Sequence, residues 1–294
     1  MSPRRQPDPV IAAGLRTLTA TPTDILAGVA MTRTGRPAGQ APTVVLVHGL
    51  GSARSTWAPV LADLAGRYHL VVVDLPGHGR SDPLADDEPA HPPALAVRLH
   101  AALAQAKVHR PHLVGSSLGG WVGLELAADG ALASLTGLAP AGLQLQPGRP
   151  NRWLSVNRRI AVATAAVADP LLAVAAIRRI TLTSGSADPA ALDADLVRSA
   201  ARAMRTSTGY ERALAGATGR RFDRAGQVTV PVSVVFGDDD RILPAPANQQ
   251  RAAAPAHARW VLVRRCGHAP MWDAPQECVR VIDDTVAAGE QQPA

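Results

Sequence analysis

The sequence has little cysteine and no long apolar run. Two cysteines cannot build a disulfide framework, so nothing here requires an oxidising compartment. A membrane-spanning helix needs roughly 20 apolar residues, and polar residues interrupt every candidate stretch. The first 15 residues include two arginines but no apolar stretch followed by a small-residue cleavage site, which argues against a secretory signal. We therefore expect a soluble, cytoplasmic protein without membrane insertion.

Lysine and aromatic residues are also scarce. Lys107 is the only lysine, so arginine supplies nearly all the positive charge behind a formal net charge of +6. Together with abundant alanine, this resembles the compositional bias of a GC-rich genome as much as selection for a basic surface. Aromatic residues make up 3% of the chain, which leaves few rings on which nucleic-acid bases could stack. We therefore expect no nucleic-acid partner.

The excess positive charge lies in one segment. Residues 141–226 carry 13 basic and 6 acidic groups, residues 1–140 carry 11 and 10, and residues 227–294 carry 6 and 8. The middle segment is therefore distinct in charge from the two segments that flank it.

Short apolar runs alternate with helix-like stretches over most of the chain. Such alternation predicts βαβ units, that is, an α/β fold with a mostly parallel sheet flanked by helices. The predicted core strands are Thr43–Val47, Leu70–Val73, Leu113–Val114, Ser134–Leu138, Val232–Phe236 and Trp260–Val263. Two earlier strands are expected near Ile25–Met31. The predicted core helices are Ala58–Gly66, Pro93–Ala106, Leu118–Ala128, Ala245–Ala253 and Pro275–Ala288.

Residues 141–226 break this alternation. They contain apolar helical patterns such as Ile160–Val167 and Leu171–Ile177, separated by proline and glycine, and no convincing strand. The simplest organisation is a core formed by residues 1–140 and 227–294, with residues 141–226 inserted as a helical cap over a functional face.

The strongest local motif is Gly115-Ser116-Ser117-Leu118-Gly119, a G-x-S-x-G between a predicted strand and a predicted helix. A serine on so sharp a turn projects its hydroxyl above the sheet, and the residues two positions away must lack a β-carbon to avoid a collision. The turn also aims the backbone N–H of Leu118 and the positive helix end at developing negative charge. Ser117 is therefore a candidate nucleophile.

At this motif the sequence resembles the α/β-hydrolase superfamily, and the resemblance covers nearly the whole chain outside the inserted segment. His48-Gly49-Leu50-Gly51 is similar to that family's oxyanion-hole loop, in which Leu50 would donate the second backbone N–H. Asp74-Leu75-Pro76-Gly77-His78-Gly79-Arg80-Ser81 is similar to the family's D-x-P-G-x-G-x-S turn. We expect His48 and His78 to be structural, fixing loops through side-chain hydrogen bonds.

The resemblance also implies an acid and a base. The stretch Phe236 to Pro244 matches the family's G-x-x-D-x-[VI]-x-P and makes Asp240 the acid, with Asp238 and Asp239 as minor candidates because three aspartates are consecutive. The stretch Cys266 to Pro275 matches G-H-x-P-x-x-[ED]-x-P and makes His268 the general base. A serine needs such an oriented base to become a nucleophile.

These motifs imply a serine hydrolase that cleaves an ester-type bond, through an acyl-enzyme, in a small and hydrophobic substrate. Arginine pairs in the cap raise the further hypothesis of an anionic substrate, against the alternative that these arginines are merely solvated. No cofactor is implied, because phosphate-loop and dinucleotide fingerprints are absent. No metal site is expected either, and Cys266 is expected to be a small buried filler.

Two alternatives stay open. Carbon–carbon bond hydrolases and cofactor-free haloperoxidase-like members of the superfamily share the serine triad, although the former typically carry an aromatic residue where this chain has Ala269. A non-catalytic binding protein on the same scaffold is the second alternative, because a fold does not guarantee chemistry.

Overall fold

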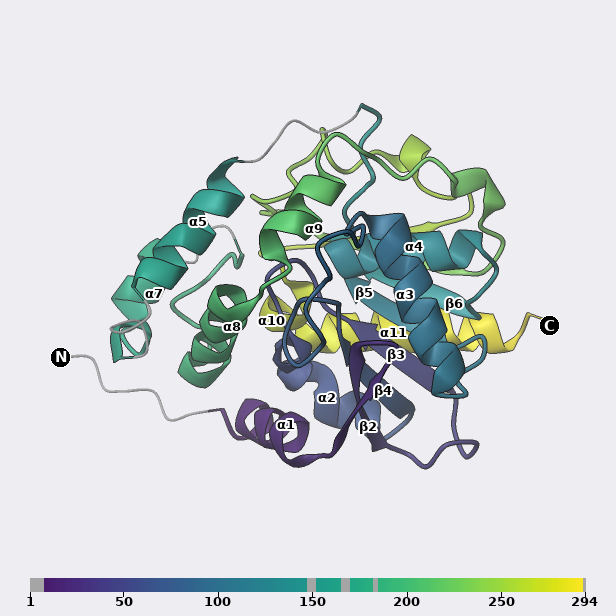
Figure 1. The fold of residues 1–294 in the computed structure, drawn as a ribbon, viewed down its shortest axis with the longest axis horizontal. Coiled ribbons are helices and arrows are strands. Elements are labelled where there is room, and N and C mark those ends of the chain that lie inside the picture. The colour runs from purple at the N-terminus through teal and green to yellow at the C-terminus, as the bar shows by residue number, and fades with distance from the viewer. Residues whose placement is uncertain (1–7, 147–151, 165–169, 182–184, 293–294) are drawn as a thin grey trace.

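The computed structural model describes residues 8–146, 152–164, 170–181 and 185–292. Its centre is an eight-stranded sheet with the order β1-β2-β4-β3-β5-β6-β7-β8 (Figure 1). β2 runs antiparallel to its neighbours β1 and β4, and every other pair is parallel. The predicted α/β fold is thus confirmed. The strands are β1 (Thr23–Leu26), β2 (Val29–Gly35), β3 (Thr43–Val47), β4 (His69–Asp74), β5 (His112–Ser116), β6 (Ser134–Leu138), β7 (Val232–Gly237) and β8 (Arg259–Val263).

Helices cover both faces of the sheet, and alternate residues of each central strand supply the two cores. In β3, Val45 and Val47 pack with α3 and α4, whereas Val44 and Leu46 pack with α2 and α11 on the opposite face. A strand buried on both faces needs the continuous apolar run seen in the sequence. The helices of this core are α1 (Pro9–Ala20), α2 (Ala58–Ala65), α3 (Pro92–Gln105), α4 (Leu118–Ala128), α10 (Pro270–Asp273) and α11 (Pro275–Glu290), with the 3₁₀ turns η1 (Arg54–Trp57), η2 (Ala225–Gln227) and η3 (Arg251–Ala253).

The N-terminal region contains a helix that the sequence analysis missed. Asp8 caps α1 by accepting hydrogen bonds from the amides of Val10 and Ile11, and Pro9 occupies the first helical position. This Asp-Pro start is a recognised helix signal. The two expected early strands are present as β1 and β2, joined by a tight turn at Ala27 and Gly28, both with positive φ.

The predicted helix over Ala245–Ala253 is wrong. One turn closes where the amide of Asn248 donates to Pro244, but the amide of Gln250 then donates to the carbonyl of Leu143 at 2.9 Å. That tertiary contact replaces the next helical bond, and only the short η3 forms afterwards. Local helix propensity is a weak signal, which such contacts override.

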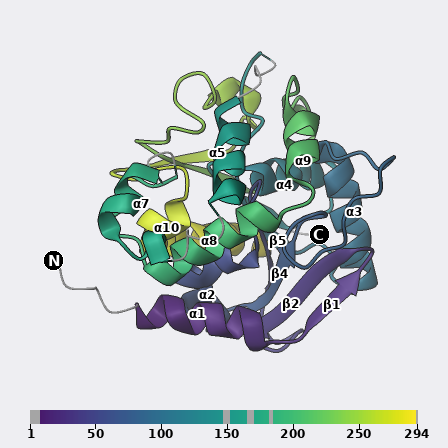
Figure 2. The ribbon, with the colours of Figure 1, turned by 60° about the vertical axis from the view of Figure 1, so that its left-hand side comes forward.

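Residues 141–226 are mainly helical in the parts that the structure describes. Their helices are α5 (Arg152–Ala163), α7 (Ala175–Thr181), α8 (Ala194–Thr206) and α9 (Tyr210–Ala217). Figures 1 and 2 both show α5, α7 and α8 grouped at one side of the sheet. The helical pattern over Leu171–Ile177 is interrupted at residues 173–174, and the end of Ile160–Val167 lies outside the described residues.

Within the described residues, no helix has both the length and the apolar character required to cross a membrane.

Candidate active site

Ser117 stands between β5 and α4 in a strained backbone conformation. Its φ of 51° and ψ of −114° place it in a region that residues other than glycine rarely occupy, at a typical cost of about 1–3 kcal/mol. Neighbouring backbone holds it there, because its amide donates to Leu138 at 2.9 Å and its carbonyl accepts from Trp121 and Ala141. The turn is therefore the strand-to-helix elbow that the motif predicts.

The two glycines of the motif are required by close backbone approaches. A β-carbon at Gly115 would lie 2.3 Å from the carbonyl oxygen of Gly119, and one at Gly119 would lie 2.4 Å from the carbonyl oxygen of Val47. Real β-carbons do not approach oxygen so closely. Both glycines of the motif are therefore required sterically, as the motif predicts.

The loop after β3 lies directly beside Ser117. A β-carbon at Gly49 would lie 3.0 Å from the Ser117 Cβ and 3.7 Å from its Oγ. Leu50 is the next residue in this loop, and Leu118 is the first residue of α4, so that its N–H has no acceptor inside the helix. The two predicted oxyanion donors thus belong to segments that flank the serine.

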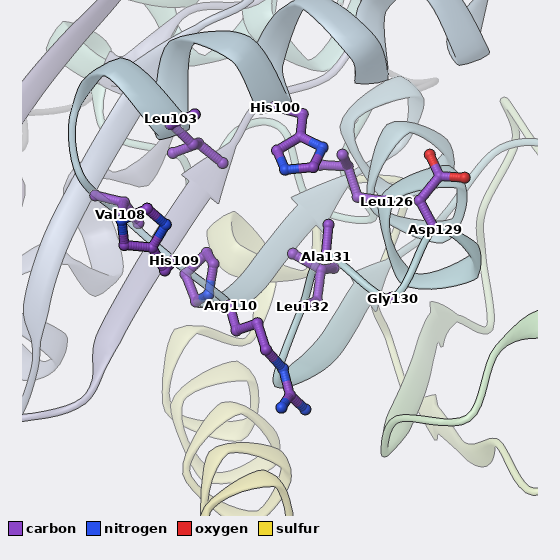
Figure 3. A pocket seen from close by; sticks show the side chains of 12 residues that line it. His100, Leu103, Val108, His109, Arg110, Leu126, Asp129, Gly130, Ala131 and Leu132 are labelled. Atoms are coloured by element: carbon purple, nitrogen blue, oxygen red, sulfur yellow. The ribbon is translucent and has the colours of Figure 1, made fainter. Parts of the chain in front are cut away.

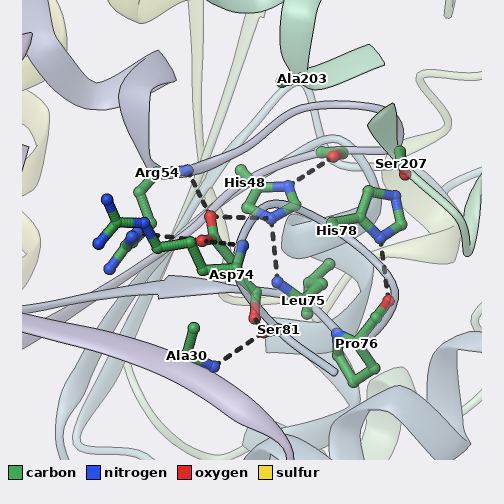
Figure 4. Close-up of polar contacts among 12 residues, drawn as sticks. Ala30, His48, Arg54, Asp74, Leu75, Pro76, His78, Ser81, Ala203 and Ser207 are labelled. Carbon is green, nitrogen blue, oxygen red and sulfur yellow. Dashed lines mark hydrogen bonds and ion pairs between the residues drawn. The ribbon is translucent and has the colours of Figure 1, made fainter. Parts of the chain in front are cut away.

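A buried polar network connects the loop after β3 with the loop after β4 (Figure 4). The imidazole of His48 donates from Nδ1 to the carbonyl of Gly49 at 2.7 Å and accepts at Nε2 from the amide of Leu75 at 2.9 Å. Asp74 accepts from the amides of Arg54 and Arg80 and forms an ion pair with the Arg54 guanidinium at 3.0 Å. The loops after β3 and β4 are therefore joined by side chains.

Both histidines of this network are neutral at pH 7. Burial lowers the pKa of His48 to about 4 and that of His78 to about 3. Nδ1 of His78 donates to the carbonyl of Pro76 at 3.0 Å. The expectation that His48 and His78 fix loops through hydrogen bonds is confirmed.

Asp240 and His268 form a buried pair beyond the ends of β7 and β8. Nδ1 of His268 and Oδ2 of Asp240 are 2.8 Å apart, while Oδ1 of Asp240 accepts from the amides of Ile242 and Leu243. Burial alone would raise the pKa of Asp240, but the charge and hydrogen bond of His268, with the two amides, outweigh it and lower that pKa below its ordinary value. The Asp240 carboxylate is therefore ionised at neutral pH and orients the imidazole of His268.

The three consecutive aspartates have separate partners. Asp238 accepts from the amide of Cys266 at 3.3 Å, and Asp239 pairs with Arg241 at the surface. Asp240 alone of the three contacts the imidazole of His268. The geometry thus favours Asp240 over its two neighbours.

Cys266, two residues before His268, is a buried filler as expected. Its thiol is fully buried, and burial, together with the charge of nearby carboxylates, raises its pKa to about 12. The thiol therefore stays protonated and unreactive at neutral pH. Cys278 is also buried and free.

Tyr210, which none of the sequence motifs contains, also contacts the loop after β3. A β-carbon at Gly51 would lie 2.6 Å from the Tyr210 ring. The Tyr210 hydroxyl donates to the carbonyl of Leu154 in α5, and the guanidinium of Arg158 lies 5.4 Å from the ring centroid. The available signal was its rarity, because the chain has only two tyrosines.

A cavity of about 240 Å³ lies elsewhere, at the amino ends of the central strands β5 and β6 (Figure 3). It is lined by residues that precede β5 and β6, such as Pro111 and Leu132, and by the exposed histidines His100 and His109. Ligands of open α/β sheets bind at the carboxyl ends of the strands, so this cavity is not part of the candidate site. Among the residues that the structure describes, no group of three His, Cys, Asp or Glu side chains is placed to hold a metal ion.

Known proteins resemble this chain in sequence and in fold. A model described as "Alpha/beta hydrolase family" matches residues 44–281. The Escherichia coli O81 (strain ED1a) protein named "Putative carbamate hydrolase RutD" is 31% identical over 262 residues, which cover 82% of this chain and 89% of that protein.

Solved structures share the fold at lower sequence identity. An enol-lactonase from Burkholderia xenovorans LB400 superposes with a TM-score of 0.67 and 20% identity, covering 90% of this chain and 100% of its own. A thermophilic esterase from Thermogutta terrifontis gives a TM-score of 0.68 and 19% identity, with 92% of this chain and 99% of its own covered.

Proposed function

The chain belongs to the alpha/beta hydrolase family, and within that family we propose that it is a serine hydrolase acting on an ester-type bond of a small, hydrophobic substrate. The bond would be a carboxylic ester, a thioester or a lactone. One observation carries the proposal: the imidazole of His268 is held by Asp240 at 2.8 Å, beyond the carboxyl ends of the parallel strands, where Ser117 occupies its strained turn. That combination of nucleophile, base and orienting acid is what acyl transfer needs.

In the first step, Ser117 Oγ attacks the substrate carbonyl carbon while Nε2 of His268 takes its proton. Asp240, ionised because its pKa is lowered, stabilises the imidazolium that forms. The amides of Leu50 and Leu118 donate to the oxyanion, and one such donor typically contributes about 3 kcal/mol. The tetrahedral intermediate then collapses, and His268 gives its proton to the leaving alcohol or thiol.

In the second step, His268 takes a proton from water, and the resulting hydroxide attacks the acyl carbon bound to Ser117. The proton returns from His268 to Oγ as the acid product leaves. Atoms and charge balance with one water consumed per bond, and no cofactor enters either step.

We further propose that residues 141–226 form a cap over this site. Support comes from the contacts of Tyr210, which joins the loop after β3 to α5. Apolar side chains of the segment, including Leu172, Leu192 and Val197, pack among themselves. A cap of this kind excludes water and shapes an apolar pocket.

The arginines of the cap support a structural role more than steering of an anionic substrate. Arg178 is buried and donates to carbonyls of Leu172, Ala173, Pro189 and Ala190. Arg158 donates to the carbonyl of Ser207, while Arg212 donates to the loop at residues 84–88. A substrate without charge is therefore the better supported choice.

Fluorophosphonate labelling tests the proposal. We expect a stoichiometric adduct on Ser117, located by peptide mass spectrometry, and none in Ser117→Ala. Turnover should fall by at least about 10⁴-fold in that variant. An intact wild-type protein that forms no adduct would instead support the non-catalytic binding protein.

A substrate panel then narrows the bond type. It should contain matched esters, thioesters and lactones of increasing acyl length, together with carbamates, because the bacterial relative cited above is named as a carbamate hydrolase. If the arginines do not steer the substrate, added salt should change kcat/KM equally for the neutral and the anionic members of the panel. The largest kcat/KM identifies the substrate class.

A further inference from the structure

Residues 185–188 of the cap lie against the loop that carries His268. A β-carbon at Gly267 would lie 2.8 Å from the Cα and carbonyl carbon of Ser186 and 3.0 Å from the amide nitrogen of Ala187. The two backbones are therefore in direct contact immediately before the candidate base.

The carboxylate of Asp273 joins these two backbones. Its Oδ2 accepts from the amide of Gly267 at 2.7 Å and from the amide of Ala187 at 3.0 Å, and its Oδ1 accepts from the hydroxyl of Ser186 at 2.5 Å. One ionisable side chain thus binds one donor from the loop of the base and two donors from the cap. Ser186 is 2% exposed, so water does not compete freely for its hydroxyl.

A second contact fixes the other side of the base. The amide of Ala269 donates to the carbonyl of Gly185 at 3.1 Å. The residues before and after His268 are therefore both tied, one through Asp273 and one directly, to the same three-residue stretch of the cap.

Asp273 itself is held by a short and anchored helix. It ends α10, in which the indole N–H of Trp272 donates to the carbonyl and hydroxyl oxygens of Thr56 in η1. The same indole packs beside Leu172, Leu192 and Val197 of the cap. The contacts of Trp272 therefore fix the position of α10, and with it the position of the Asp273 carboxylate.

From these contacts we propose that Asp273 is a positioning residue, which sets the place of His268 by binding its loop to residues 185–187 of the cap. The inference rests on the proposed function, because it assigns His268 the role of general base. A displacement of about 1 Å in a catalytic group can cost about 10²-fold in rate. Loss of the Asp273 carboxylate should therefore slow the chemistry of Ser117 rather than weaken substrate binding.

The test compares Asp273→Ala, Asp273→Asn and Ser186→Ala with wild type. Asparagine can repeat the geometry, because its carbonyl oxygen can accept from both amides while its NH₂ donates to the Ser186 hydroxyl. Asp284→Asn is the matched control, since Asp284 is an exposed aspartate of α11 whose contact is an ion pair with Arg259 at the surface. The probe is a fluorophosphonate. The rate constant of labelling reports the reactivity of each site, and the final extent of labelling reports the number of folded sites, so the two are compared separately.

Labelling rate and kcat should fall 10- to 100-fold in Asp273→Ala, with KM changed less than threefold. The labelling rate and kcat of Asp273→Asn should lie within threefold of the wild-type values. Those of Ser186→Ala should lie between the values of Asp273→Ala and Asp273→Asn, and those of Asp284→Asn should match wild type. A rate per site in Asp273→Ala within twofold of wild type would overturn the proposal, as would an Asp273→Asn variant as slow as Asp273→Ala. If Asp273→Ala does not fold, a wild-type rate in Ser186→Ala overturns the proposed link to the cap.

A proton NMR readout separates failure of this inference from failure of the proposed function. The Nδ1 proton shared by His268 and Asp240 gives a downfield resonance, assigned by its loss in His268→Ala. If Asp273 positions the imidazole, that resonance shifts or broadens in Asp273→Ala and returns in Asp273→Asn, whether or not the wild type is labelled. An unchanged resonance in Asp273→Ala overturns the inference, while an unlabelled wild type overturns the function alone.

Discussion

The two halves of the candidate site are built in different ways. The half that holds Ser117 is fixed by backbone: a positive φ, three backbone hydrogen bonds and glycines pressed against carbonyl oxygens. The half that holds His268 also has a backbone bond, from Ala269 to Gly185, but it depends on two side chains, with Asp240 on the ring and Asp273 on the loop. Short motifs therefore encode the first half, whereas the second depends on contacts between residues far apart in the chain.

The largest expected effect tests the half built by side chains. Asp240→Asn keeps the shape but removes the charge that stabilises the imidazolium, so kcat should fall by about 10⁴-fold. Asp239→Asn is the matched control and should stay within about twofold, because Asp239 pairs with Arg241 at the surface. Steady-state kinetics on the best ester of the panel gives both values. Equal losses in the two variants would return the acid to the open choice among neighbouring aspartates.

A smaller effect tests the half built by backbone. Gly119→Ala in an ordinary helix would stabilise by up to about 1 kcal/mol, but here the new methyl would lie 2.4 Å from the carbonyl oxygen of Val47. We expect a loss of about 3 kcal/mol or more in unfolding free energy, measured by urea titration, together with loss of labelling at Ser117.

Gly226→Ala is the control for this experiment, because a β-carbon there has no neighbour within 4 Å. It should leave stability within about 0.5 kcal/mol. A fully stable and active Gly119→Ala would show that the elbow tolerates displacement and that the contrast between the two halves is overstated.

The smallest effect concerns the neutral His48, which supports the loop after β3. The pKa of His48 is about 4 in the folded state against 6.5 ordinarily, so below pH 6.5 the unfolded chain binds a proton that the folded chain does not. The contribution of His48 to the free energy of unfolding is therefore fully present above pH 6.5. It falls as the pH drops towards 4, by about 1.4 kcal/mol per pH unit.

Urea titrations between pH 7 and 5 measure this slope. His48→Gln should lower stability at pH 7 yet show a shallower pH dependence than wild type, while His109→Gln, at an exposed position, should keep the wild-type slope. Parallel slopes for wild type and His48→Gln would mean that the loop is not supported by a neutral imidazole.

The elements that were predicted correctly are marked by local sequence patterns, whereas the wrongly predicted helix was overridden by a tertiary contact. The sheet strands and the elbow at Ser117 follow from apolar runs and glycine spacing, which are local in the sequence even though the neighbour that requires Gly119, the carbonyl of Val47, is distant. The helix predicted over Ala245–Ala253 fails because Gln250 bonds to Leu143, more than 100 residues away. No local sequence pattern indicates that Gln250 will donate to the carbonyl of Leu143.

The same reasoning explains the site residues. Asp240 and His268 could be predicted because their motifs resemble those of the family, but the contact that separates Asp240 from Asp239 exists only in three dimensions. Asp273 lay inside a matched motif, yet its three donors come from residues 186, 187 and 267. By contrast, the Asp-Pro start of α1 was a local signal and could have been recognised.

The burial of both thiols has a practical consequence. Because Cys266 and Cys278 are inaccessible and their pKa values are raised, maleimide dyes should ignore them at neutral pH. A single cysteine introduced at exposed Ile160 on α5 would then carry a fluorophore without removal of either native thiol. Movement of that helix during turnover could be followed in the otherwise unaltered protein.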